Sequence, residues 1–210
     1  PGVLSGMNYD RDGESVTAIG VLASVNRTSI TNVNVAIGNS ATANIGAAYA
    51  FGGMVGVNLG TLSGTVSYGA YTISLGGKDA CSYFGGAVGI NRGVADGIKV
   101  SFDGGTLYAD NGSGTLAVLG GAIGLQDSPS LSDVQVNGYD GKLTVSGAGL
   151  VGGVIGVANL SDSATVSGVT ATKTELYNIS NAVYGMTLES TDGYKGLISG
   201  SLSDGAVKGV

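Results

Sequence analysis

A glycine-rich segment recurs along the chain at nearly constant spacing, and this repeat constrains the fold more than any other feature. Four copies share a glycine pair, two apolar residues, a third glycine and another apolar residue, at 52–57, 85–90, 120–125 and 152–157. Successive copies begin 33, 35 and 32 residues apart. Degraded copies lie at 20–26 and 196–200. Repeats of this kind are stable only when stacked on their neighbours.

Further apolar residues alternate with polar ones after each glycine-rich segment, as in 62–68 and 98–102, and weaker runs follow at 71–75 and 142–145. Alternation with period two predicts β-strands. Glycine pairs and β-branched residues disfavour a helical repeat. We therefore expect an all-β fold: a right-handed parallel β-solenoid of about six rungs, with about 33 residues and three short strands per rung. Equivalent residues of neighbouring rungs would stack about 4.8 Å apart.

The rungs predict one domain over residues 1–210, because no Pro-rich or charge-rich linker divides the chain. We expect residues 1–17 to form an N-terminal cap or lead-in, and residues 18–170 to form the regular rungs. We expect residues 171–210 to form irregular last rungs or a C-terminal cap. Caps are expected because the end rungs of a solenoid otherwise expose strand edges.

The two faces of the glycine-rich strand differ in side-chain size. Val55 and Val57 share one face with their equivalents in later copies, which predicts a stacked core column. The other face carries an uncharged stripe of small residues with one methionine, namely Gly52, Met54, Gly56, Gly89, Gly124 and Gly156. We expect such a stripe to be covered. We favour cover by a loop or terminal segment of the same chain, and the alternative is a lateral interface with another subunit.

Two copies of the repeat, 53–60 and 86–93, end in Asn-x-Gly, at Asn58 and Asn91. In this form the segment resembles the GLUG motif of bacterial surface proteins, which include immunoglobulin A peptidase-type and adhesin-like repeat regions. The third and fourth copies carry Gln126 and Ala158 instead of the asparagine, so the resemblance covers the middle half of the chain. It implies a bacterial extracellular or cell-surface location and a non-catalytic role.

Catalytic signatures are weak in this sequence. The chain has no histidine, which excludes Ser-His-Asp triads and imidazole metal ligands, and the single cysteine, Cys81, is expected to be structural. Acidic residues follow several glycine-rich strands at similar intervals, at Asp96, Asp133, Asp162 and Asp204. We favour turn-forming aspartates here. The alternative is a carboxylate ladder that binds cations or serves glycan hydrolysis.

One segment near the N-terminus resembles a calcium loop. Asn8, Asp10 and Asp12 alternate as oxygen ligands, the turn glycine follows, and Glu14 could complete the set. Ile19 occupies the position where an EF-hand has its bidentate glutamate. We favour an acidic solvated loop, with calcium as the alternative and no other cofactor expected.

The charge and hydropathy of the chain limit the kinds of partner that we expect. Charged residues make up 11% of the chain and the net charge is −6, so nucleic acid is not an expected partner. The longest apolar stretch, 147–160, is too short and too glycine-rich for membrane insertion. We expect a non-catalytic structural or adhesive module, possibly self-associating, whose partner is a host or cell-surface protein, a glycan or another copy of itself. The alternative is a carbohydrate-active enzyme or glycan-binding module on the same scaffold.

Overall fold

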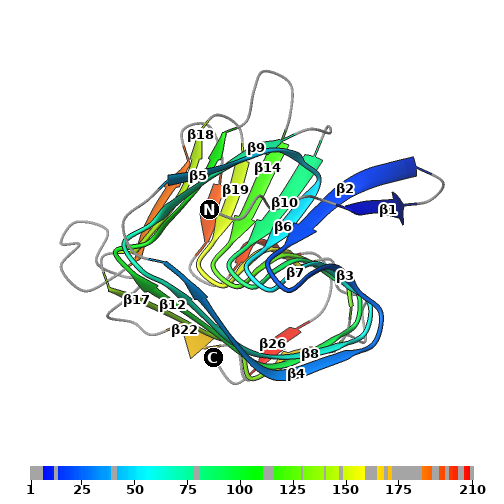
Figure 1. Ribbon diagram of the computed structural model, residues 1–210. Coiled ribbons are helices and arrows are strands. Elements are labelled where there is room, and N and C mark those ends of the chain that lie inside the picture. The colour runs from blue at the N-terminus through cyan, green and yellow to red at the C-terminus, as the bar shows by residue number, and fades with distance from the viewer. Residues whose placement is uncertain are drawn as a thin grey trace.

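The chain is folded as a β-solenoid of about four turns (Figure 1). The computed structural model describes residues 7–11, 14–38, 42–77, 81–110, 116–128, 130–139, 141–146, 149–158, 165–167, 170–171, 186–190, 194–196, 199–202 and 206–208. Within these ranges every regular element is a β-strand, and none is a helix. The strands form four sheets, which we name A to D, and the chain passes through them in this order on each turn. The predicted all-β parallel solenoid is confirmed.

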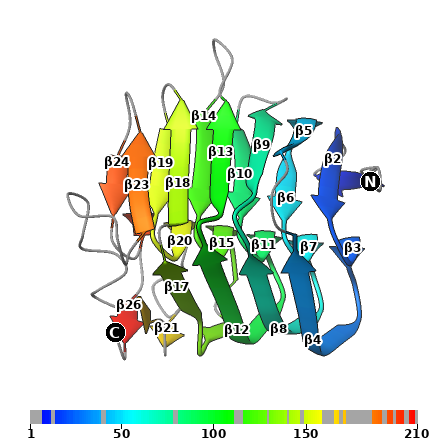
Figure 2. The ribbon, with the colours of Figure 1, turned by 60° about the vertical axis from the view of Figure 1, so that its left-hand side comes forward.

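Strands of successive turns lie side by side in each sheet (Figure 2). Sheet A contains β1 (Met7–Arg11), β2 (Glu14–Gly20), β6 (Ala50–Gly52), β10 (Cys81–Gly85), β14 (Leu116–Gly120), β19 (Gly149–Gly152) and β24 (Tyr194–Gly196). Sheet B contains β3 (Ala23–Asn26), β7 (Val55–Asn58), β11 (Val88–Asn91), β15 (Ile123–Gln126), β20 (Ile155–Ala158) and β25 (Ser199–Leu202). Strands β1 and β2 are antiparallel, whereas neighbouring turns pair in parallel.

The other two sheets complete each turn. Sheet C contains β4 (Ser29–Ile37), β8 (Thr61–Tyr68), β12 (Val94–Asp103), β16 (Ser130–Ser132), β17 (Gln135–Tyr139), β21 (Thr165–Ser167), β22 (Thr170–Ala171) and β26 (Ala206–Lys208). Sheet D contains β5 (Thr42–Ala48), β9 (Thr72–Gly77), β13 (Thr106–Asp110), β18 (Gly141–Ser146) and β23 (Met186–Ser190).

The expectation of three strands per turn is wrong, because the chain crosses four sheets. The glycine-rich segment was counted as one strand, but it bends at the glycine pair and supplies the end of a sheet A strand and the following sheet B strand. At the bend, the backbone N–H groups of Met54 and Val55 both donate to the carbonyl oxygen of Ala87 on the next turn, at 2.8 and 3.1 Å. The corner is thus hydrogen-bonded from turn to turn, as the strands are.

The predicted apolar columns exist, but the two residues of each copy belong to different clusters. Val55 pairs with Val88, as Val57 does with Ile90, so the predicted register is confirmed. Val55 and Val88 belong to the main core, whereas Val57 and Ile90 pack in a second cluster with Tyr49. Each large side chain contributes roughly 1.5–3 kcal/mol when buried. Both clusters run along the stack and hold successive turns together.

Candidate functional site

Sheet C carries a bulge on three of its turns but not on the turn of β8. Its residues are Asn32, Gly97 and Asp133, which share left-handed φ angles of 55°, 67° and 49°. Asparagine, glycine and aspartate tolerate this conformation best. The equivalent stretch of β8 is one residue shorter: only Ser63 stands opposite each two-residue bulge, and Gly64 follows with a φ of 146°. The strands on both sides of β8 therefore carry a bulge that β8 lacks.

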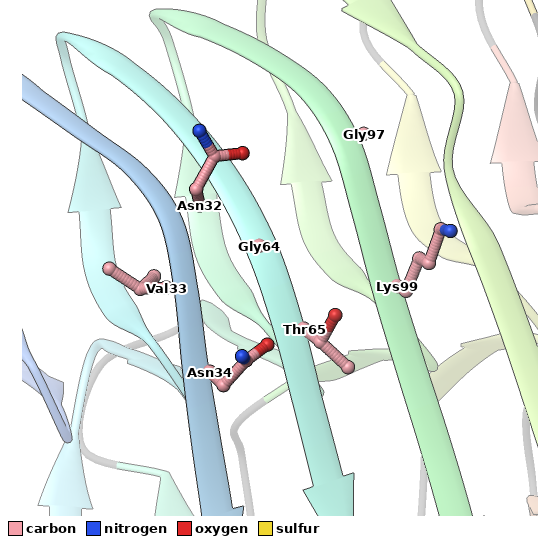
Figure 3. A pocket seen from close by; sticks show the side chains of 7 residues that line it. All are labelled: Asn32, Val33, Asn34, Gly64, Thr65, Gly97 and Lys99. Atoms are coloured by element: carbon pink, nitrogen blue, oxygen red, sulfur yellow. The ribbon is translucent and has the colours of Figure 1, made fainter.

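The missing residue leaves a shallow groove of about 310 Å³ across β4, β8 and β12 (Figure 3). Its lining residues are Asn32, Val33, Asn34, Gly64, Thr65, Gly97 and Lys99. The register places Asn34 beside Thr65 and Thr65 beside Lys99, so each strand supplies one polar side chain to the same row. This groove is the candidate functional site.

The three polar side chains of the row are available to a ligand. Asn34 and Lys99 are exposed and Thr65 is half-buried. Within the described part of the chain, none of these three side chains makes a hydrogen bond or ion pair to the protein. Asp96, the acidic residue nearest to Lys99 along β12, accepts a hydrogen bond from the Ser132 hydroxyl on the following turn. The groove therefore offers an amide, a hydroxyl and an ammonium group without internal partners.

A second hollow of about 300 Å³ lies further along the same strands. It is lined by Ala36, Ile37, Gly38, Ser67, Tyr68, Gly69 and Asp103. Ser67 follows Thr65 by two residues on β8, so both belong to the same face of the strand. The two hollows thus form consecutive positions along β8.

A buried ladder of side-chain amides holds the corner that leads into sheet C. The Nδ2 atoms of Asn26, Asn58 and Asn91 donate to the side-chain oxygens of Asn58, Asn91 and Gln126, at 2.8, 2.7 and 2.9 Å. Asn26 and Asn58 also donate to the backbone carbonyls of Thr61 and Val94, at 3.1 Å each. Buried amides are tolerated because they are paired in this way. The asparagine of the repeat motif is thus structural: it ties sheet B to the start of sheet C.

The predicted interface stripe is buried inside the chain. Gly52, Met54, Gly56, Gly89, Gly124 and Gly156 all have buried positions. A Cβ atom at Gly89 would lie 2.8 Å from the backbone nitrogen of Phe51, and one at Gly124 would lie 2.7 Å from that of Phe84. Sheet A strands of the preceding turn therefore cover the stripe glycines that belong to sheet B, whereas Met54 packs in the main core. The expected cover within the chain is present, but a neighbouring sheet provides it instead of a loop or terminal segment, and a partner subunit has no access to these residues.

Three of the four predicted calcium residues lie on the first strand pair. Asn8 and Asp10 belong to β1, Glu14 opens β2, and Asp12 lies outside the described residues. The antiparallel register pairs Glu14 with Arg11, whereas Asp10 pairs with Ser15. Among the described residues, no group of three or more His, Cys, Asp or Glu side chains gathers in a metal-binding arrangement.

Two of the four acidic residues that were considered as a ladder lie within the described part of the chain. Asp96 and Asp133 are exposed on sheet C and its bulge, whereas Asp162 and Asp204 lie outside the described residues. The left-handed conformation of Asp133 agrees with the turn-forming role favoured for these aspartates. Cys81 is half-buried on β10.

The groove residues were not predicted as a site. A signal was present, because aligning the repeats shows that Ser63-Gly64 is shorter by one residue than the equivalent stretches at 31–33 and 96–98. Comparison with known protein families, with curated proteins and with solved structures produced no match. None of the described segments forms a helix long and apolar enough to cross a membrane.

Proposed function

We propose that this chain is a non-catalytic structural or adhesive module of a bacterial extracellular or cell-surface protein. The observation that carries the proposal is the continuous turn-to-turn pairing of all four sheets, which the buried amide ladder reinforces. Stacking of this kind makes a stiff body whose sheet faces and loops are free to contact partners. The resemblance of the repeat to the GLUG motif supports the location.

The handedness of the coil and its number of rungs are also part of this proposal. We infer a right-handed coil of about six rungs, because six copies of the repeat occur in the sequence. The partners are a host or cell-surface protein, a glycan or neighbouring copies of the chain. Calcium binding at Asn8, Asp10, Asp12 and Glu14 stays a prediction. Calorimetric titration with millimolar calcium, together with the melting temperature, tests it: no heat and unchanged melting would remove it.

Surface labelling of the producing cells tests the location. Antibodies raised against the folded chain are applied to intact cells and to permeabilised cells. We expect equal labelling of both, and loss of the signal after brief external protease treatment. Labelling that requires permeabilisation would overturn the proposal. Light scattering over a range of concentrations tests self-association, and a monomer at every concentration would exclude that part alone.

A carbohydrate-active or glycan-binding module is the second candidate, and the polar groove on sheet C favours its binding form. The catalytic form requires carboxylates that act on a glycosidic bond. Turnover on a panel of acidic and neutral polysaccharides, lost in Asp96→Asn or Asp133→Asn, would establish it. The absence of turnover on every polysaccharide of the panel would exclude the catalytic form.

A further inference from the structure

The polar groove across β4, β8 and β12 has the dimensions of a small-ligand site. Neighbouring strands are about 4.8 Å apart, so the row from Asn34 through Thr65 to Lys99 spans roughly 10 Å. The volume of about 310 Å³ is at the lower end of the range for ligand pockets. Such a space admits a single ring with its substituents.

The functional groups of the row define the chemistry of the ligand. The amide of Asn34 and the hydroxyl of Thr65 each donate and accept hydrogen bonds, as the hydroxyl groups of a sugar do. Lys99 adds three donors and one positive charge, and among the described residues it is the only charged one that lines the groove. One ammonium group balances a carboxylate, whereas a phosphate carries up to two negative charges.

We propose that this groove binds an acidic carbohydrate, in which a sugar carboxylate pairs with the ammonium group of Lys99. The ring hydroxyls then bond to Asn34 and Thr65, whose side chains have no partner among the described residues. Gly64 lines the same groove, and a Cβ atom there would clash with the backbone carbonyl oxygen of Val33, which keeps β4 and β8 close together at this place. This inference rests on the adhesive role proposed above and names the ligand class for it.

The second hollow extends the site along β8. Ser67 lies two residues beyond Thr65, about 7 Å along the strand. Of the described residues that line this hollow, Asp103 alone is charged, and it repels a second carboxylate. The preferred ligand is therefore an oligosaccharide whose acidic unit occupies the first hollow and whose neutral unit occupies the second.

Calorimetric titration at low salt tests the proposal. The probes are galacturonic acid, its methyl ester as the uncharged counterpart, and acetate as a carboxylate without a sugar ring. We expect a dissociation constant on the order of 1 mM for galacturonic acid, and binding at least about tenfold weaker for the other two. Lys99→Gln should weaken binding of galacturonic acid about tenfold, and Thr65→Val should weaken it less. Arg27→Gln removes an exposed cation outside the groove and should leave binding unchanged.

The melting temperature of each variant confirms that it is folded before it is titrated. Equal affinity for galacturonic acid and its methyl ester, or equal loss of binding in Lys99→Gln and Arg27→Gln, would overturn the assignment to this groove. No binding of galacturonic acid would overturn the proposal as a whole. Surface labelling of intact cells would still support the structural role in that case, so the two failures are distinguishable.

Discussion

The phenol hydroxyl of Tyr68 donates a hydrogen bond of 2.6 Å to the backbone carbonyl oxygen of Gly86. Tyr68 ends strand β8 of sheet C, and Gly86 lies at the corner between sheets A and B on the next turn. The tyrosine ring is fully buried and stacks on Phe102 at a centroid distance of 4.8 Å. The bond thus joins sheet C to the glycine corner through the middle of the core.

Tyr68 makes the stability of the fold sensitive to alkaline pH. Burial raises the pKa of Tyr68 above its ordinary value of about 10, so the folded state holds its proton more tightly than the unfolded state. Its contribution is complete below about pH 10 and falls above that pH by up to about 1.4 kcal/mol per unit. Tyr68→Phe should lose about 1–3 kcal/mol at neutral pH and show a shallower alkaline decline.

Urea unfolding, followed by circular dichroism between about pH 8 and pH 11, measures both effects. Tyr71→Phe serves as the control, because Tyr71 is only partly buried. This control should decline with pH as steeply as the unmodified protein. Equal slopes for Tyr68→Phe and the unmodified protein would contradict the buried position of the phenol.

The amide ladder should contribute strongly to stability at Asn58. This side chain donates to Asn91 and Val94 and accepts from Asn26. Asn58→Leu keeps the number and branching of the side-chain heavy atoms but leaves buried polar groups unpaired, so we expect a loss of about 2–4 kcal/mol in the free energy of unfolding. Asn34→Leu, at an exposed position, should change it by about 0.5 kcal/mol or less. Similar losses in both variants would refute a special role for the ladder.

The contact between sheets A and B requires glycine at position 89. An added Cβ atom would lie 2.6 Å from the carbonyl oxygen of Gly56 and 2.8 Å from the backbone nitrogen of Phe51. Because backbone atoms cannot move aside locally, Gly89→Ala should destabilise the protein by about 3 kcal/mol or prevent folding. Gly38→Ala is the matched control, since no atom of the described part of the chain lies within 4 Å of its added Cβ. Thermal melting compares the two, and a Gly89→Ala protein as stable as the control would contradict this packing.

The bulge on sheet C should accept asparagine at Gly97. This glycine has the same left-handed conformation as Asn32, and an added Cβ would meet nothing within 4 Å. Gly97→Asn should therefore be neutral or stabilise the protein by up to about 1 kcal/mol, because it restricts the unfolded chain. Gly97→Val should cost about 1–2 kcal/mol, since a β-branched residue disfavours positive φ. Urea unfolding measures the midpoint of each variant. Equal midpoints for Gly97→Asn and Gly97→Val would rule out the left-handed conformation of Gly97.

The sequence allowed the parallel stacking to be predicted, including the pairing of Val55 with Val88 and of Val57 with Ile90. The number of strands per turn was predicted wrongly. A glycine pair is compatible with a straight strand or a corner, and only its contacts to the next turn distinguish the two. The groove at Asn34, Thr65 and Lys99 was missed for a related reason, because it arises from a difference in length between neighbouring turns.

The repeat pattern alone specifies which residues of successive repeats stand side by side, because a repeat of nearly constant length aligns them in register. It also determined that Gly56 and Gly89 form an uncharged, small-residue stripe. What lies against that stripe follows from the three-dimensional fold, which places the backbone of sheet A there. The alternation of residues along a strand defines its two faces, but what covers a face depends on where the chain bends and which distant segment then packs against it.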